Sequence, residues 1–86
     1  MADRNIGHYL VSYDGATEEV DEIIRIDQFH LDEFREAFAV PPNDPEMHDR
    51  YAVGPDDIRF LRPKLAREVE FEFAERAYFI EALQTD

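Results

Sequence analysis

Hydrophobic and polar positions alternate along the first third of the chain. Residues 7–13, GHYLVSY, are rich in aromatic and β-branched residues, and the turn-forming segment 14–17, DGAT, follows them. After the turn, apolar residues recur at even spacing, at Val20, Ile24 and Ile26. The alternate positions carry Glu19, Asp21, Ile23 and Arg25. This period of two predicts an antiparallel hairpin whose second strand has a mostly charged outer face.

The period changes to that of a helix over residues 30–38. Apolar residues fall there at i, i+3, i+6 and i+7, namely Leu31, Phe34, Ala37 and Phe38. This spacing predicts a short amphipathic helix, with Asp27 as its cap and Pro41 preventing its continuation. A helix of about two turns is not stable by itself, so we expect it to dock on the sheet.

The second half of the chain contains four further patterns. Tyr51 and Val53 indicate a short third strand. Residues 55–61 begin with proline and have the pattern of one or two helical turns that end before the next proline. Residues 69–73 alternate Val or Phe with Glu, which is a β-like pattern. Residues 78–83 form another apolar run, which predicts a strand.

Together these elements predict one α+β domain over residues 1–86. Its expected architecture is a three- to four-stranded, mainly antiparallel sheet with one short helix packed on one face. One short helix covers only that face, so we expect the other face to be open and to expose aromatic surface. Periodicity leaves both faces of the first strand as candidates for burial, with Tyr9, Val11 and Tyr13 on one face and Leu10 on the other.

Composition narrows the classes of partner. The 86 residues include 21 acidic and nine basic side chains, a formal net charge of −12, yet 44% are apolar, which supports a folded core. Nucleic acids and anionic membranes would repel such a chain, so the expected partner is a basic protein. The same charge on a solvated surface would also serve solubility alone.

The N-terminus lacks the apolar run of about seven or more residues of a signal peptide. No stretch approaches the roughly 18 apolar residues of a membrane span. We therefore expect a cytoplasmic protein. Because the chain has no cysteine, disulfides, thiolate metal sites and a cysteine nucleophile are excluded.

The sequence favours a binding protein over an enzyme. The spacing of His8, His30 and His48 lacks the pairing of metal sites, and no glycine-rich phosphate loop or serine nucleophile motif occurs. Paired carboxylates are frequent, but on strand faces and turns solvent keeps them ionised, which does not suit general acid catalysis. We therefore expect no catalytic residue, no metal and no cofactor.

Several segments of the chain match a known family in order and spacing. The hairpin 13–20 has an aromatic, an Asp, a polar turn with Thr, two acids and an apolar residue; residues 40–41, VP, close the helix, and YFI at 78–80 lies in the last strand. Between them lie Tyr51, Val53, Leu61 and Pro63. With its length and acidity, the chain resembles the immunity proteins of the cloacin and ribosome-cleaving colicin family, which bind and neutralise a cytotoxic ribonuclease domain.

This resemblance implies a four-stranded antiparallel sheet with a short helix on one face, an open face that holds the toxin, and Leu10 in the core. It places apolar contacts at Tyr13, Val20 and Phe79 and a specificity position at Arg50. The implied partner-binding residues are Tyr13, Asp14, Glu19, Val20, Glu22, Arg50, Phe79 and Glu81.

The chain departs from the family at Val20, which replaces an aromatic residue, and at Arg50, which replaces a small neutral one. A positive charge at the specificity position argues against the toxin partners of the known members.

The resulting hypothesis is an immunity protein that binds and inhibits a cationic, ribonuclease-type toxin through an acidic, aromatic sheet face. It is expected to act as a monomer or weak homodimer, without catalysis and without binding nucleic acid or membrane. The alternative is a small acidic protein-interaction module with a different partner, or one that associates with itself.

Overall fold

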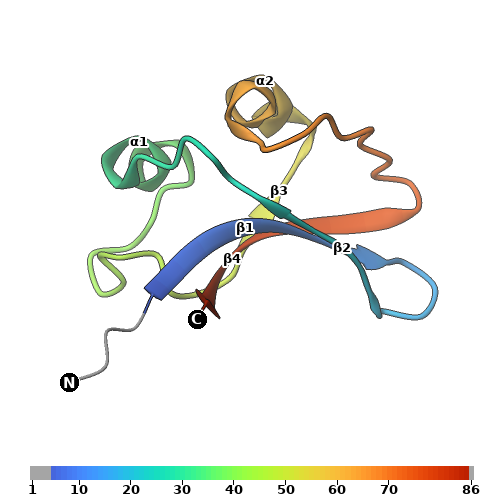
Figure 1. The fold of residues 1–86 in the computed structure, drawn as a ribbon, viewed down its shortest axis with the longest axis horizontal. Helices are drawn as coiled ribbons and strands as arrows, with labels where there is room; N and C mark the ends of the chain where they lie inside the picture. Colours follow the sequence, from blue (N-terminus) through green and yellow to red (C-terminus); the bar gives the residue numbers. More distant parts are fainter. Residues whose placement is uncertain (1–4, 86) are drawn as a thin grey trace.

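A computed structural model describes residues 5–85 and contains one antiparallel sheet (Figure 1). Within these residues the sheet has four strands in the order β2-β1-β4-β3. The strands are β1 (Asn5–Asp14), β2 (Val20–Arg25), β3 (Tyr51–Val53) and β4 (Arg76–Thr85). The two long strands, β1 and β4, pair in the centre, and each carries a shorter strand on its outer edge.

Short helices lie on one side of this sheet. They are α1 (Leu31–Ala37) and α2 (Ile58–Leu61), the latter preceded by the 3₁₀ turn η1 (Pro55–Asp57) and followed by η2 (Arg62–Lys64). In Figure 1 both α1 and α2 stand above the sheet, and neither covers its lower face. The predicted α+β fold with an open sheet is therefore confirmed, and the helical turns expected over residues 55–61 form η1 and α2. No helix among residues 5–85 has the length and apolar character needed to cross a membrane.

The core lies between the sheet and the helices. In β1 the side chains of Leu10 and Ser12 point into it, and both are fully buried. The buried apolar cluster consists of Leu10, Ile24, Ile26, Phe34, Met47, Val53, Leu61, Val69, Tyr78 and Ile80. Leu10 thus faces the helices, and the neighbouring positions Tyr9, Val11 and Tyr13 belong to the open face.

An irregularity in the hairpin changes the face of one predicted core residue. The register runs from Ser12 opposite Glu22 to Tyr13 opposite Val20, so Asp21 is an extra residue in β2. Such a bulge reverses the alternation of side chains beyond it. The prediction that Val20 shares a face with Ile24 is therefore wrong, because Val20 lies on the open face and is 53% exposed.

Helix α1 begins without the predicted cap. His30 holds the N-cap position and makes no capping hydrogen bond through its side chain. The carboxylate of Asp27 instead accepts a hydrogen bond from Arg25 Nε at 3.0 Å, and its backbone N–H donates to the Lys64 carbonyl at 2.7 Å. Asp27 therefore joins the end of the hairpin to η2 and is not the cap.

The β-like pattern over residues 69–73 does not form a strand. Its apolar residues cover the edge of the core as a loop, in which the Phe71 and Phe73 rings stack at 5.7 Å and both contact Tyr78. The backbone N–H of Glu72 donates to the Tyr78 hydroxyl at 2.9 Å. The alternation of apolar and acidic residues here therefore reflects contact of the apolar side chains with the core, and not pairing with a neighbouring strand.

Candidate functional site

The open face carries apolar side chains from the three longer strands. Val11 lies opposite Ile23 of β2 and Phe79 of β4, and its neighbours leave it only 2% exposed. Towards the outer edge, Val20 and Ile23 are 53% and 52% exposed. The bulge at Asp21 brings these two side chains to the same face. Two large aliphatic residues side by side in solvent are a typical component of a protein-binding surface.

Four residues from three distant segments meet in the middle of this face, and we name them the Arg50 cluster: Tyr13, Arg50, Phe79 and Glu81. The Tyr13 and Phe79 rings pack edge to face, with centroids 5.7 Å apart. The guanidinium carbon of Arg50 lies 4.4 Å from the Phe79 centroid and 5.4 Å from that of Tyr13. Both distances are within the range of cation–π attraction.

Glu81 ties the Arg50 cluster together. One of its carboxylate oxygens accepts a hydrogen bond from the Tyr13 hydroxyl and lies 3.9 Å from Nη1 of Arg50. The hydrogen bond to Glu81, helped by burial, raises the pKa of Tyr13. The Glu81 side chain is only 15% exposed, whereas that of Arg50 is 55% exposed. The guanidinium is thus held on its rings while much of it faces solvent.

The segment before β3 positions Arg50. Asp44 organises this segment, because its carboxylate accepts hydrogen bonds from the backbone N–H groups of His48 and Asp49 and from the Tyr51 hydroxyl. These donors lower the pKa of Asp44, with the Tyr51 hydroxyl the largest cause. Burial and the bond to Asp44 raise the pKa of Tyr51 to about 12. The chain around Arg50 is therefore held by polar contacts on both sides of it.

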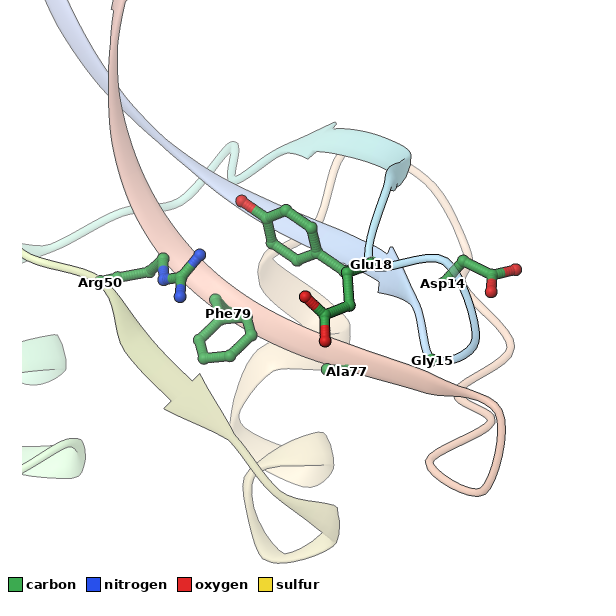
Figure 2. Close-up of a pocket in the computed structure, with 7 residues that line it drawn as sticks. Asp14, Gly15, Glu18, Arg50, Ala77 and Phe79 are labelled. Atoms are coloured by element: carbon green, nitrogen blue, oxygen red, sulfur yellow. The ribbon is translucent and has the colours of Figure 1, made fainter.

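A cavity of about 410 Å³ lies beside the Arg50 cluster (Figure 2). It is lined by Tyr13, Asp14, Gly15, Glu18, Arg50, Ala77 and Phe79. In Figure 2 the Arg50 guanidinium points towards the Phe79 ring from one side and the Glu18 carboxylate stands on the other, while the carboxylate of Asp14 points away. The cavity has apolar walls with opposite charges at its two ends.

The hairpin turn forms the acidic end of this cavity. Asp14 Oδ1 accepts hydrogen bonds from the backbone N–H groups of Ala16 and Thr17 at 2.8 and 3.0 Å, which lower the pKa of Asp14. Glu18 adopts a left-handed conformation, φ 64°, which is uncommon outside glycine. Gly15 donates its N–H to the Glu75 carbonyl at 2.9 Å, and a Cβ at Gly15 would lie 2.8 Å from that oxygen. This contact joins the turn to the start of β4.

The structure brings most of the predicted site residues together. Tyr13, Arg50, Phe79 and Glu81 form the cluster, and Val20 lies directly opposite Tyr13. Asp14 lines the cavity but its carboxylate serves the turn, and Glu19 is exposed in the same loop, where its carbonyl accepts the Asp14 N–H.

Glu22 does not join the open face. It lies opposite the buried Ser12, and its carboxylate pairs with Arg67 at 2.9 Å, in the loop before β4. The expectation that Glu22 neighbours the partner-binding surface is therefore wrong, because Glu22 alternates regularly with Ile24 and lies on the side of the helices, and the bulge at Asp21 turns only Val20 to the open face.

Sequence reasoning missed four residues of this region, one of which, Gly15, lines the cavity from the hairpin turn. Ile23 was placed on a mostly charged face, although an isoleucine among charges was itself a signal of an exposed apolar patch. Glu18 and Ala77 line the cavity, but nothing in their local pattern marks them, because the cavity forms only when the hairpin turn meets β4.

The side chain of His8 packs against its neighbours on the side of the helices. His8 stacks on Phe29 with ring centroids 3.9 Å apart, and its Nε2 is 3.0 Å from the Met47 carbonyl oxygen. Burial is the largest cause of the lowered pKa of His8. Among the residues that the structure describes, no group of three or more His, Asp or Glu is placed to hold a metal ion.

A family model described as Domain of unknown function (DUF7683) matches residues 8–81, so the chain belongs to that family. No curated protein and no solved structure matches the chain.

Proposed function

We propose that this member of the DUF7683 family is a protein-binding module that holds a basic protein on its open sheet face. We further propose that the partner is a cationic nuclease toxin, of the ribonuclease type, which the module inhibits by occupying its nucleic-acid-binding surface. The proposal gives the module no catalytic role, and it places this action in the cytoplasm.

The observation that carries the proposal is the uncovered face of the sheet. It combines exposed aliphatic side chains, at Val20 and Ile23, with the aromatic rings and the guanidinium of the Arg50 cluster. Binding hot spots are enriched in tyrosine and arginine and are surrounded by contacts that exclude water. A surface with this composition supports contact with a protein.

Charge supports a basic partner. The chain has a net charge of −12, and the open face and its hairpin turn include Asp14, Glu18, Glu19 and Glu81. Complementary potentials speed encounter, so association at low salt is expected to exceed the ordinary range of about 10⁵–10⁷ M⁻¹s⁻¹ and to slow as salt is added. A nuclease is a fitting partner because its nucleic-acid-binding surface must itself be basic.

The nuclease part of the proposal rests on the resemblance to the cloacin and colicin immunity proteins. That resemblance assigns partner contacts to Tyr13, Arg50 and Phe79, which are three of the four residues of the Arg50 cluster. Arg50 replaces the small neutral residue that the cloacin and colicin immunity proteins carry at the specificity position. A toxin different from those of the known members is therefore proposed as the partner.

The test is a pull-down with the polypeptide encoded next to the gene, followed by titration of that polypeptide's nuclease activity. The proposal expects a complex and complete inhibition at one equivalent. Ile23→Lys should weaken the complex by about tenfold or more, because it replaces an apolar contact of the open face by a charge that repels a basic partner.

Ile6→Lys is the matched control. Ile6 is also an exposed aliphatic residue of β1, at 40%, but its position has the parity of Leu10 and belongs to the side of the helices. This variant should bind within about threefold of the wild type. Equal losses from the two variants would remove the open face from the interface.

The self-associating module predicts different results. A stable homodimer in light scattering that Ile23→Lys dissociates, together with no inhibition of the neighbouring polypeptide, would replace the inhibitor proposal by self-association. The net charge of −12 opposes such a dimer, because like potentials repel.

A further inference from the structure

We propose that the cavity beside the Arg50 cluster is the subsite that receives an arginine side chain of the basic partner. This inference rests on the proposed function, since it names the chemical group that the open face recognises. The alkyl stem of the arginine would lie on Ala77 and Phe79, and its guanidinium would meet the Glu18 carboxylate.

The shape of the cavity suits a long side chain with a charged end. Its volume of about 410 Å³ is within the range of roughly 300–1,000 Å³ of small-ligand sites. Two residues with little or no side chain line it, Ala77 beside the ring of Phe79 and Gly15 in the hairpin turn. The hydrogen bond from Gly15 to the Glu75 carbonyl holds the turn against β4, so the cavity is largely preformed.

The walls already bind a guanidinium of this chain. Arg50 stacks 4.4 Å from the Phe79 centroid and 5.4 Å from that of Tyr13. These aromatic rings therefore attract a cation in the geometry observed, independently of the acidic residues nearby. Arg50 occupies one end of the cavity, and among the residues that the structure describes no basic side chain lines the opposite end, at Glu18.

The Glu18 end of the cavity carries a negative charge that can attract a cation. Within residues 5–85 the Glu18 carboxylate makes no ion pair, whereas Arg50 has Glu81 at 3.9 Å. Glu18 and Glu81 thus place two carboxylates beside the single guanidinium of Arg50. The local charge is negative, so a second cation is attracted despite the presence of Arg50.

Arginine fits this site better than lysine. Its planar guanidinium can donate two parallel hydrogen bonds to one carboxylate, here that of Glu18. Lysine is a compact, strongly hydrated charge that loses more on leaving water for an aromatic wall. The subsite should therefore prefer an arginine-rich partner surface.

The experiment uses the full chain with a hexa-arginine peptide as probe. Calorimetry gives the dissociation constant, and nuclear magnetic resonance locates the contact through the backbone amides of Gly15, Ala77 and Phe79, which should shift. Glu18→Gln should weaken binding by about fivefold, whereas the matched control Glu36→Gln, an exposed glutamate on α1, should weaken it by less than about twofold.

A second variant removes the cavity without a change of charge. Ala77→Leu fills the space beside Phe79 and should weaken binding of the hexa-arginine peptide as much as Glu18→Gln does. Hexa-lysine should bind at least about threefold more weakly than hexa-arginine to the wild type.

Equal losses from Glu18→Gln and Glu36→Gln would overturn the inference, because binding would then follow net charge alone. Equal affinity for hexa-lysine and hexa-arginine would also overturn it. Since the peptide assay needs no toxin, site-specific peptide binding without nuclease inhibition would defeat only the proposed function. Inhibition without a peptide site would defeat only this subsite.

Discussion

The two faces of the sheet are built from the same strands but differ in what covers them. On one face Leu10 and Ile80 pack under the helices with Phe34 and are fully buried. On the other face, no helix within residues 5–85 covers the strands (Figure 1), and Val20 and Ile23 remain more than half exposed. Alternate positions of one strand therefore have separate roles. The covered face supplies stability, and the open face is available for contact.

The largest effect should come from removing a ring from the covered face. Phe34→Ala deletes a fully buried side chain that packs on Phe29, Phe38 and Phe60. It should lower the free energy of unfolding by about 3–5 kcal/mol, through lost burial and the cavity left behind. Urea denaturation followed by circular dichroism measures the change. A loss below about 1 kcal/mol would mean that α1 is not docked as described.

The next effect should come from the junction between the hairpin turn and β4. Gly15→Ala places a Cβ 2.8 Å from the Glu75 carbonyl oxygen, so the turn or the strand must shift. The expected cost is about 1–3 kcal/mol, measured in the same denaturation experiment. Ala16→Ser, in the exposed part of the same turn, is the control and should stay close to the wild type. Equal free energies of unfolding for the two variants would mean that Gly15 is not in close contact with the Glu75 carbonyl.

A smaller effect is a pH dependence of stability that comes from the partly buried His8. Burial lowers the folded-state pKa of His8 below its ordinary value of 6.5, so the folded protein binds this proton less readily than the unfolded chain. Its contribution to stability is therefore present above pH 6.5 and lost as pH falls below that value. The denaturation midpoint should fall less between pH 7.5 and 5 in His8→Phe, which keeps the stacking on Phe29. Parallel curves for the two proteins would contradict this.

The smallest effect on stability should come from the open face. Val20→Ser changes a side chain that is 53% exposed and should alter the free energy of unfolding by no more than about 0.5 kcal/mol. The same variant should weaken partner binding, because it removes apolar contact beside Tyr13. Denaturation and the nuclease titration together test this separation. A large stability loss would show that Val20 belongs to a packed core.

Elements with local causes were predictable. The turn after β1 and the two-residue alternation of its strand depend on neighbours in the sequence, as does the helical spacing of Leu31, Phe34 and Phe38. The pattern over residues 69–73 failed for the opposite reason. Its alternation reflects contact with Tyr78 and the core edge, and a pattern alone does not show whether a neighbouring strand is present to accept hydrogen bonds.

The candidate site was predictable only in part. The resemblance assigned Tyr13, Arg50 and Phe79 to one surface, and the structure does bring their side chains together. It also assigned Glu22 there, but Glu22 alternates with Ile24 on the side of the helices, and the extra residue Asp21 separates it from Val20 on the open face. A single-residue bulge leaves little trace in composition, yet it exchanges the faces of every side chain beyond it.

Residue types and short-range spacing are enough to give the charge, the absence of cysteine, the α+β class and the local elements. The covered face of β1, the place of the bulge and the stacking of Arg50 on Tyr13 and Phe79 become visible in the folded chain. The physical reason is distance along the chain. These contacts join residues tens of positions apart, and their geometry follows from strand register and from the packing of whole elements.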